Sequence, residues 1–514
     1  TMESTSQLLA LPFDLIDVTL QYLDVTDWLV ACMSCKLVLD AVNHILSSGE
    51  LSLSRCAQTV TDGWLIRMLQ RLPPGSLRTL DLSECCLLTK HGIARALRFG
   101  GCFNLEELRV LHVGEASWSV MQLKRVVDAC PSLRFVHADC RTKGTGPEQL
   151  DLLMSDTAVR LHKLVVQRAP PAADTEISLS ESALGTALLR CKESLVELDT
   201  RAIEGDKGTV EHVSKLISSE GCALRRLVLP GTAALRNEDS AQTFATALSS
   251  NEGLEVLQLG CSSITSSGAS TIAAALGPHP SLRSLELHHN PLLDAGAISL
   301  GTALHGNRSL RHLAMPFTGL GDGACAALAL ALRCGSTLDE LDLSGNMLSA
   351  DGIIGLAEAL PHGVLTSLAL SANQGIGTRG TLALAAVLAD TSLSTLRLDG
   401  CGVRSKGCSR LASVLPKSRM QSLDLSANEM GDLGAWELAW RLPECKELTE
   451  LRLAVNEIED DGASELLTGL QANKSLRLLD LRGNRISVDS TTGLELVATQ
   501  RTNMRFQRAA RPNY

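Results

Sequence analysis

Apolar residues along the chain follow two alternating periods. From Leu77 onward, the pattern Leu-x-x-Leu-x-Leu-x-x-Asn/Cys recurs, and the stretch 282–290 is a clean copy. Period two within each copy predicts a short strand, because successive side chains of a strand point to opposite faces. A stretch of helical period follows, as in 294–304, and often begins near a glycine such as Gly296. Each unit therefore predicts one strand and one helix.

Fifteen copies of the pattern follow one another in steps of mostly 27 to 30 residues. Their first positions are Leu77, Leu105, Leu133, Leu161, Leu195, Leu224, Leu254, Leu282, Leu310, Leu338, Leu365, Leu393, Met420, Leu448 and Leu476. One step of 34 residues, from Leu161 to Leu195, contains Pro170 and Pro171 and predicts a longer loop. Repeats of this length bury their apolar face only against their neighbours, so we expect a stack of units.

The last position of the pattern differs between the two halves of the chain. From Leu282 onward it holds Asn290, Thr318, Asn346, Asn373, Cys401, Asn428, Asn456 and Asn484. Before that it holds Cys85, Val113, Arg141, Ala169, Ile203, Thr232 and Ser262. An amide both donates and accepts hydrogen bonds, so we interpret the Asn column as structural, satisfying backbone groups where the chain leaves the sheet.

With about 28 residues and a full helix per unit, these repeats resemble the leucine-rich repeats of the ribonuclease-inhibitor type. The resemblance implies an α/β leucine-rich repeat solenoid, a horseshoe with a parallel sheet on its concave side and helices on its convex side. The earlier units contain Cys102-x-x-Leu105 and Cys130-x-x-Leu133. In this they resemble the cysteine-containing repeats of F-box proteins.

The segment before the repeats reads as short helices: Leu11-Pro12-x-Asp14-Leu15-Ile16, followed by Leu20-x-Tyr22-Leu23, Asp27-Trp28-Leu29 and Cys35-Lys36. It resembles an F-box, the motif that docks on the Skp adaptor of cullin-RING ubiquitin ligases. The resemblance implies an adaptor-binding face made of Leu11, Pro12, Leu15, Ile16, Leu20, Leu23, Leu29, Cys35 and Lys36. Thr19, Ser34 and Val38 depart from the usual residues. The alternative is a helical cap over the open edge of the solenoid.

These patterns predict four segments. We expect an F-box-like helical segment at 1–48, irregular repeats at 49–253, regular ribonuclease-inhibitor-type repeats at 254–490, and a terminal helix with a basic tail at 491–514. The tail from Gln500 to Tyr514 carries Arg501, Arg505, Arg508 and Arg511 without an acidic residue.

Composition narrows the function classes. Hydrophobic residues make up 45% of the chain but aromatics only 3%, so Leu, Ala and Val must build the core. A formal charge of −10 argues against a nucleic-acid surface, which needs a basic excess. No signal-peptide pattern and no long apolar run occurs, so we expect no membrane insertion. The 16 cysteines are scattered along the chain, as suits a reducing compartment. We expect a cytoplasmic protein, with the nucleus, cytoskeleton or cilium as alternatives.

Three motifs suggest chemistry, but their place in the repeats or in the F-box-like segment explains each of them better than a catalytic or metal site does. The run 375–380 matches a dinucleotide fingerprint with Asp399 downstream, but it enters a repeat helix. The repeat register keeps five histidines apart: His279, His288, His289, His305 and His312. Cys32-x-x-Cys35 has no second pair and falls in the F-box-like segment. We therefore expect no catalytic residues, no metal and no cofactor, and a protein that is not an enzyme.

Three functions remain after these exclusions. The first is a substrate receptor of a Skp/cullin/F-box ubiquitin ligase, with the Skp adaptor and a substrate protein as partners. The second is a scaffold subunit of a large axonemal or cytoskeletal complex, with a vestigial F-box. The third is a Ran-type GTPase activator, against which the F-box-like start and the missing acidic tail argue.

Two surfaces are expected to bind protein partners. On the concave side we predict a docking point at Val256, Gln258, Glu286, Pro316 and Phe317, with an apolar recess that includes Gly260. On the convex side, Trp436 and Trp440 lie one helical turn apart and outside the predicted core columns. An exposed Trp pair is typical of an interface anchor.

Overall fold

A computed structural model of the chain describes residues 49–53, 60–71, 74–83, 85, 87–110, 125–126, 129–133, 135–138, 140–141, 163–167, 188–189, 192–193, 195–200, 207–487, 489–490, 492–494 and 505–507. The predicted F-box-like segment and its adaptor face from Leu11 to Lys36 lie outside the described residues. The chain divides into two compact units, one of residues 1–204 and 219–228, the other of residues 205–218 and 229–514.

The first unit contains two runs of parallel strands. One sheet has the order β1 (Glu50–Ser52), β2 (Thr79–Asp81), β3 (Glu107–Val110) and β4 (Phe135–Ala138), with helices α5 (Asp62–Arg71) and α6 (Lys90–Phe99) in its connections. The second run pairs β5 (Cys140–Arg141), β6 (Lys163–Gln167), β7 (Glu197–Asp199) and β8 (Arg226–Val228). The irregular repeats therefore keep the strand-after-strand pairing.

The second unit repeats one strand and one helix throughout its described length. Its strands are β9 (Val256–Gln258), β10 (Ser284–Glu286), β11 (His312–Ala314), β12 (Glu340–Asp342), β13 (Ser367–Ala369), β14 (Thr395–Arg397), β15 (Ser422–Asp424), β16 (Glu450–Arg452), β17 (Leu478–Asp480) and β18 (Arg505–Gln507). Its helices are α10 (Lys207–Ile217), α11 (Glu238–Ser249), α12 (Ser266–Leu276), α13 (Leu293–Leu304), α14 (Asp322–Arg333), α15 (Ala350–Ala357), α16 (Gly377–Val387), α17 (Arg404–Val414), α18 (Gly431–Arg441) and α19 (Asp460–Ala472).

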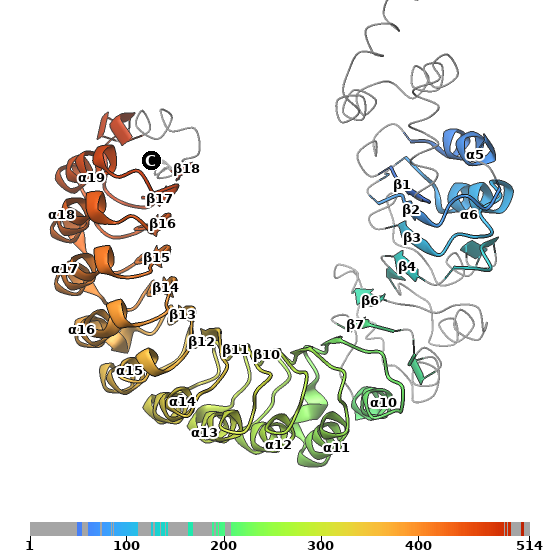
Figure 1. The fold of residues 1–514 in the computed structure, drawn as a ribbon, viewed down its shortest axis with the longest axis horizontal. Coiled ribbons are helices and arrows are strands. Elements are labelled where there is room, and N and C mark those ends of the chain that lie inside the picture. Colours follow the sequence, from blue (N-terminus) through green and yellow to red (C-terminus); the bar gives the residue numbers. More distant parts are fainter. Residues whose placement is uncertain are drawn as a thin grey trace, which may run out of the picture. The chain divides into compact units, whose positions relative to one another are not determined.

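These elements confirm the predicted fold class, an α/β leucine-rich repeat solenoid with an open parallel sheet. Figure 1 shows the strands of the second unit along its inner side and the helices along its outer side. The expected tail segment also contributes β18, which pairs in parallel with β17. No helix in the described parts of the chain is long and apolar enough to cross a membrane.

A constant register produces the core. From β9 to β17, each strand places its central leucine opposite the central leucine of the next strand, as Leu257 lies opposite Leu285 and Leu285 opposite Leu313. These leucines are fully buried, together with helix residues such as Leu300. Burying one such side chain contributes roughly 1.5–3 kcal/mol relative to exposure. Because the strands are short, the core is a single layer that continues from repeat to repeat.

The Asn column is structural, as the sequence predicts. The buried Asn346 side chain donates from Nδ2 to the carbonyl oxygens of Met315, 2.9 Å away in the preceding repeat, and of Leu343, at 2.8 Å. Its Oδ1 accepts from the Thr318 backbone N–H at 3.0 Å. Where the column lacks Asn, a smaller donor takes part of this role: the Thr318 hydroxyl donates to the Met315 carbonyl at 2.7 Å.

Aspartates at the helix entries form a second link between repeats that we did not predict. Asp294 accepts the Gly321 N–H at 2.7 Å and the Ala324 N–H at 3.1 Å, both from the next repeat. Four more aspartates accept the N–H of a residue at the next helix entry: Asp62, Asp322, Asp432 and Asp460. These bonds satisfy backbone donors that the next helix cannot pair internally. At Asp460 the bonds from the Ser487 backbone and the Ser490 and Ser487 hydroxyls lower the carboxyl pKa.

A third column lies at the helix exits. Asn251, Asn307 and Asn473 are buried, and each amide bonds the backbone of its own repeat and of the preceding one. His279 occupies this column between the first two. Its Nδ1 accepts from the Leu282 N–H at 3.2 Å, while its buried Nε2 has no hydrogen-bond partner in the structure.

We predict that His279→Asn stabilises the fold increasingly as pH falls from 7 to 5. Burial lowers the His279 pKa, so the folded protein holds this ring neutral while the unfolded chain binds a proton below about pH 6.5. Stability from this site is therefore present above that pH and is lost as pH falls. Thermal melting of wild type and variant at several pH values measures the difference. His279→Asn should raise the midpoint, and the same change at exposed His362 should not; equal effects would contradict the prediction.

Candidate interaction surfaces

The inner face of the second unit presents the first and last residues of every strand. Several aspartates on it are engaged by the backbone. Asp342 and Asp424 each accept the N–H of the residue two positions on, at 2.9 and 3.0 Å. Asp480 is 2% exposed and receives two bonds from the Arg482 guanidinium, at 2.9 and 2.7 Å. These carboxylates close turns after the strands.

The C-terminal end of this face is balanced in charge. Arg397, Asp424, Arg452 and Asp480 alternate across adjacent strands in direct register. Burial raises the pKa of Asp424 and the neighbouring Asp399 raises it further, whereas bonds from Ser426 and the charge of Arg452 oppose the shift. Neighbouring strands thus compensate one another's charges here, which leaves little net charge for an external ligand.

The predicted concave docking point falls mainly on β9 and β10. Gln258 and Glu286 lie opposite each other on these strands, and the Gln258 amide donates to the Glu286 carboxylate at 2.7 Å. Val256 lies at the start of β9, and all three side chains are partly exposed. The position of Gly260, where we expected an apolar recess, lies against the His288 ring: a Cβ there would be 2.0 Å from that ring. The His288 imidazole therefore occupies the place where we expected an apolar recess.

Pro316 and Phe317 follow β11 and lie at the edge of the sheet. Phe317 is 52% exposed and stacks on His289, with ring centroids 4.7 Å apart and planes 3° from parallel. Phe317 and His289 have positive φ angles of 56° and 54°. They occupy a column of the repeat in which other repeats have Gly345 or Gly400. Ladder hydrogen bonds hold this backbone: His289 donates to the Pro316 carbonyl at 3.0 Å, and Phe317 donates to the Ser344 carbonyl at 2.9 Å.

Sequence reasoning missed the rest of this edge. Leu293 is 51% exposed and belongs to the repeat of His289, and Met347 is 70% exposed and belongs to the repeat after that of Phe317. We call His289, Leu293, Phe317 and Met347 the rim patch. Glycines make room for it, since a Cβ on Gly345 would be 2.3 Å from the Phe317 ring and one on Gly319 would be 3.1 Å from Leu293. A glycine in the column beside a large residue is the signal that could have revealed it.

We predict that Gly345→Ala lowers stability by about 1–3 kcal/mol and displaces the Phe317 ring from His289. Two effects contribute, a left-handed φ of 64° and the short contact with Phe317. In a Phe317→Ala background only the backbone effect remains, so the loss should be smaller. Thermal melting of the two single variants and the double variant measures this coupling. Additive losses would show that the ring does not press on Gly345.

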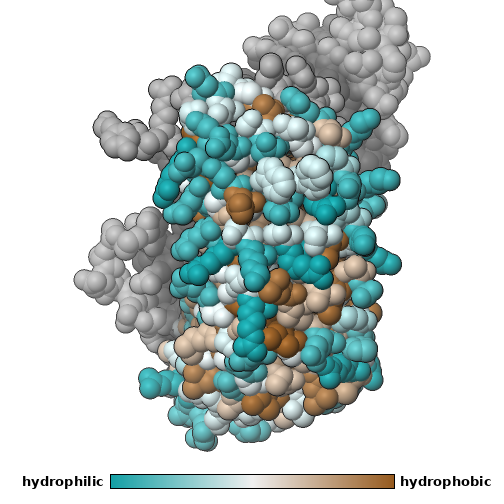
Figure 2. All heavy atoms as spheres, turned by 90° about the vertical axis from the view of Figure 1, so that its left-hand side faces the viewer, coloured by the Kyte–Doolittle hydropathy of each residue, from teal (hydrophilic) through white to brown (hydrophobic). Residues whose placement is uncertain are grey.

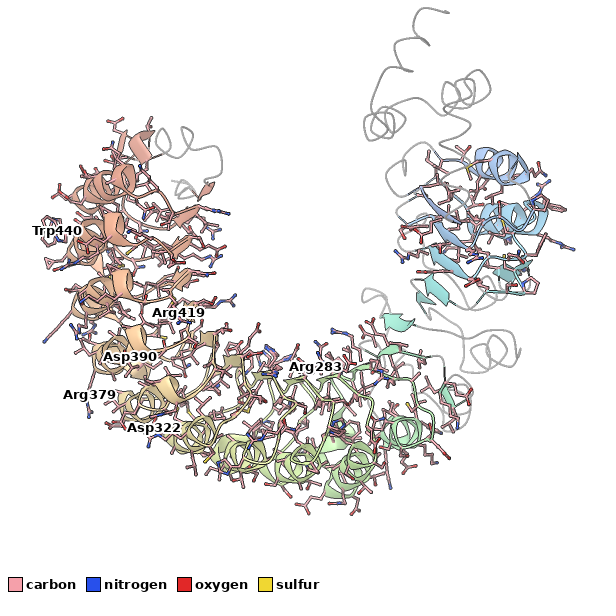
Figure 3. All side chains as sticks on the ribbon, in the orientation of Figure 1. Arg283, Asp322, Arg379, Asp390, Arg419 and Trp440 are labelled. Carbon is pink, nitrogen blue, oxygen red and sulfur yellow. The ribbon has the colours of Figure 1, made fainter. Side chains whose placement is uncertain are left out.

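The two tryptophans lie on the outer side of α18. Trp436 is 45% exposed and Trp440 is 63% exposed, with ring centroids 5.9 Å apart, and Leu433 one turn earlier is 66% exposed. Figure 3 shows Trp440 pointing away from the sheet. Figure 2 shows the outer face of this part of the unit, where hydrophilic side chains surround separate apolar patches. The rings are not core residues, and their role in binding stays a prediction.

No group of three or more His, Cys, Asp or Glu side chains that could hold a metal ion occurs among the described residues. His312 Nδ1 lies 2.9 Å from the Glu340 carboxylate on the neighbouring strand, whereas His279 is in the buried column described above. The fingerprint-like run 375–380 enters α16 through a short 3-10 turn, Gln374–Ile376, in the ordinary repeat register.

A family model described as Leucine Rich repeat matches residues 279–301, 336–357, 420–439 and 444–467. Each stretch contains one strand of the second unit and most of the helix that follows it. No curated protein sequence matches the chain.

The solved structures that are similar to the chain include the following two. One chain of the Rad7 and Elc1 complex in yeast aligns with a TM-score of 0.42 and 14% identity, over 91% of this chain and 87% of that chain. One chain of the TLR13–ssRNA13 complex aligns with a TM-score of 0.41 and 17% identity, over 85% of this chain and 65% of that chain.

Proposed function

We propose that this protein is a non-catalytic protein-interaction module and acts as the substrate receptor of a Skp/cullin/F-box ubiquitin ligase. In this proposal the inner face of β9 to β11, with the rim patch, captures a protein. The F-box-like segment joins it to the ligase. A Skp adaptor and a substrate protein are the expected partners, in the cytoplasm.

The observation that carries the capture role is the combination of side chains at one end of the inner face. Gln258 and Glu286 bond each other and remain partly exposed, while Phe317 and His289 present stacked rings beside them. An apolar group rimmed by hydrogen-bonding groups suits a protein partner, because the rings supply burial and the polar groups supply specificity. The charges farther along the sheet compensate each other across strands.

We expect Gln258→Arg with Glu286→Arg to weaken capture of the substrate at least tenfold. The change replaces an acceptor and a neutral amide by two like charges on adjacent strands, which repel each other and mismatch the partner. Quantitative pull-down from cells that express the protein compares the proteins enriched on wild type and variant. The control, Gln242→Arg with Glu252→Arg, places the same charges on exposed residues outside the inner face. Equal recovery by all three proteins would exclude the centre of the inner face.

The ligase role rests on the F-box resemblance and has its own test. Leu15→Asp with Leu20→Asp should abolish binding of a purified Skp adaptor to the full chain, because two carboxylates would enter an apolar interface. The matched control is Leu87→Asp with Leu330→Asp, at leucines that are 50% and 52% exposed. Failure of the wild-type protein to bind the adaptor would reject this role and leave the capture role to its separate test.

A scaffold subunit of a large axonemal or cytoskeletal assembly is the second candidate. Departures at Thr19, Ser34 and Val38 favour it, and so does a second exposed apolar surface on α18. A scaffold that joins two neighbours needs two separate faces, and the inner face and the tryptophans are on opposite sides of the repeats. Under this proposal the protein sediments with a large assembly and binds no adaptor.

A further inference from the structure

Three consecutive helices of the second unit carry opposite charges on either side of the tryptophans. The segment 404–419, which contains α17, has five basic residues and no acidic one: Arg404, Lys406, Arg410, Lys417 and Arg419. The segment 457–472, which contains α19, has five acidic residues and no basic one: Glu457, Glu459, Asp460, Asp461 and Glu465. Since α18 packs between α17 and α19, the tryptophans separate a basic flank from an acidic flank.

Neither neighbouring helix, α17 nor α19, has a large side chain beside the tryptophan rings. With the helices aligned at Gly407, Gly434 and Gly462, the positions equivalent to Trp436 and Trp440 hold Ser409 and Ser413 in α17, and Ser464 and Thr468 in α19. These small side chains cannot cover an indole. We call Leu433, Trp436 and Trp440 the tryptophan ridge.

Only some of the flanking charges are paired: Arg404 pairs with Glu429, and Arg485 pairs with Glu457 and Glu459. Elsewhere on the outer face adjacent repeats pair their charges, as Arg379 does with Asp351 at 2.8 Å and Arg333 with Glu358 at 3.2 Å. In contrast, five exposed side chains beside the ridge form no ion pair with any described residue: Lys406, Arg410, Lys417, Asp461 and Glu465. Exposed apolar surface and unpaired charges of both signs therefore occur together on one face.

We propose that the tryptophan ridge is the interface of a homodimer, with a second copy of this chain as its occupant. A two-fold axis in the interface plane and parallel to α18 keeps the two ridges facing each other and exchanges their flanks. The basic α17 of one copy then faces the acidic α19 of the other, twice. A two-fold axis in the same plane but perpendicular to α18 would instead place α17 opposite α17 and α19 opposite α19, so that like charges face each other. The charge pattern thus selects one dimer geometry, independently of the function proposed above.

The size of the face predicts a weak dimer. Helices of 11 to 13 residues are about 16–20 Å long, and three of them at a spacing of roughly 10 Å give a footprint smaller than the usual 800 Å² per partner. The apolar contribution comes from tryptophans, which are typical of the few residues that dominate binding energies. We therefore expect a dissociation constant in the micromolar range that rises with salt concentration.

Charge exchange between two variants tests the geometry directly. Within the helices themselves, Lys406→Glu with Arg410→Glu makes α17 acidic like α19, and Asp461→Lys with Glu465→Lys makes α19 basic like α17. Each variant alone should be monomeric in sedimentation equilibrium of the full chain between about 1 and 100 µM, where wild type dimerises. An equimolar mixture should form a heterodimer, because every contact between flanks is again between opposite charges.

Two further variants separate loss of the dimer interface from other effects of the substitutions. Arg95→Glu with Arg98→Glu, on exposed residues of α6, should leave the dimer unchanged. Trp440→Ser, which copies the residue at the equivalent position of α17, should abolish it without altering circular dichroism, and serves if a charge variant fails to fold. A monomeric wild type, a dimer that survives either charge variant or Trp440→Ser, or a mixture of well-folded variants that does not associate would each overturn the proposal.

Discussion

Each repeat of this protein depends on its neighbours to satisfy its backbone. A strand of three residues cannot pair its own polar groups, and the turn that follows leaves more donors and acceptors buried. Asn290 illustrates the solution, because its amide donates to the Leu259 and Leu287 carbonyls and accepts from the Ser262 and Ile264 N–H groups. An unsatisfied buried group costs about 1–3 kcal/mol, so a repeat is stable only within the stack.

The same requirement explains why bulky residues adopt left-handed backbone in this fold. Val455 and Phe317 have φ near 55°, a conformation that glycine adopts at the same position in other repeats. Val455 donates its N–H to the Arg482 carbonyl of the next repeat at 2.8 Å. The ladder bond offsets the conformational cost of about 1–3 kcal/mol. The side chain then projects at the edge of the sheet, where the fold does not need it and a partner can contact it.

Because the core and the bonds between repeats use fixed columns of aliphatic and small residues, asparagines and aspartates, positions outside those columns are free to vary. The inner face uses this freedom for the Gln258–Glu286 pair and the stacked rings, and α17 to α19 use it for separated charges around two tryptophans. Binding on opposite faces is compatible with the fold because inward and outward side chains belong to different elements. One repeat can therefore carry an inner and an outer site without compromise in the core between them.

The sequence by itself determined the repeat, the strand and helix in each unit, the core columns and the structural role of the Asn column. These features are periodic, so the same residue pattern in the other repeats supports the assignment made in any one repeat. The exposure of Trp436 and Trp440 was also predictable, because the repeat register places both outside the core columns. By contrast, three features depend on contacts between residues of adjacent repeats: the His288 ring against Gly260, the His289–Phe317 stack and the buried His279. Such contacts depend on backbone conformation and side-chain direction at single positions, and periodicity carries no information about either.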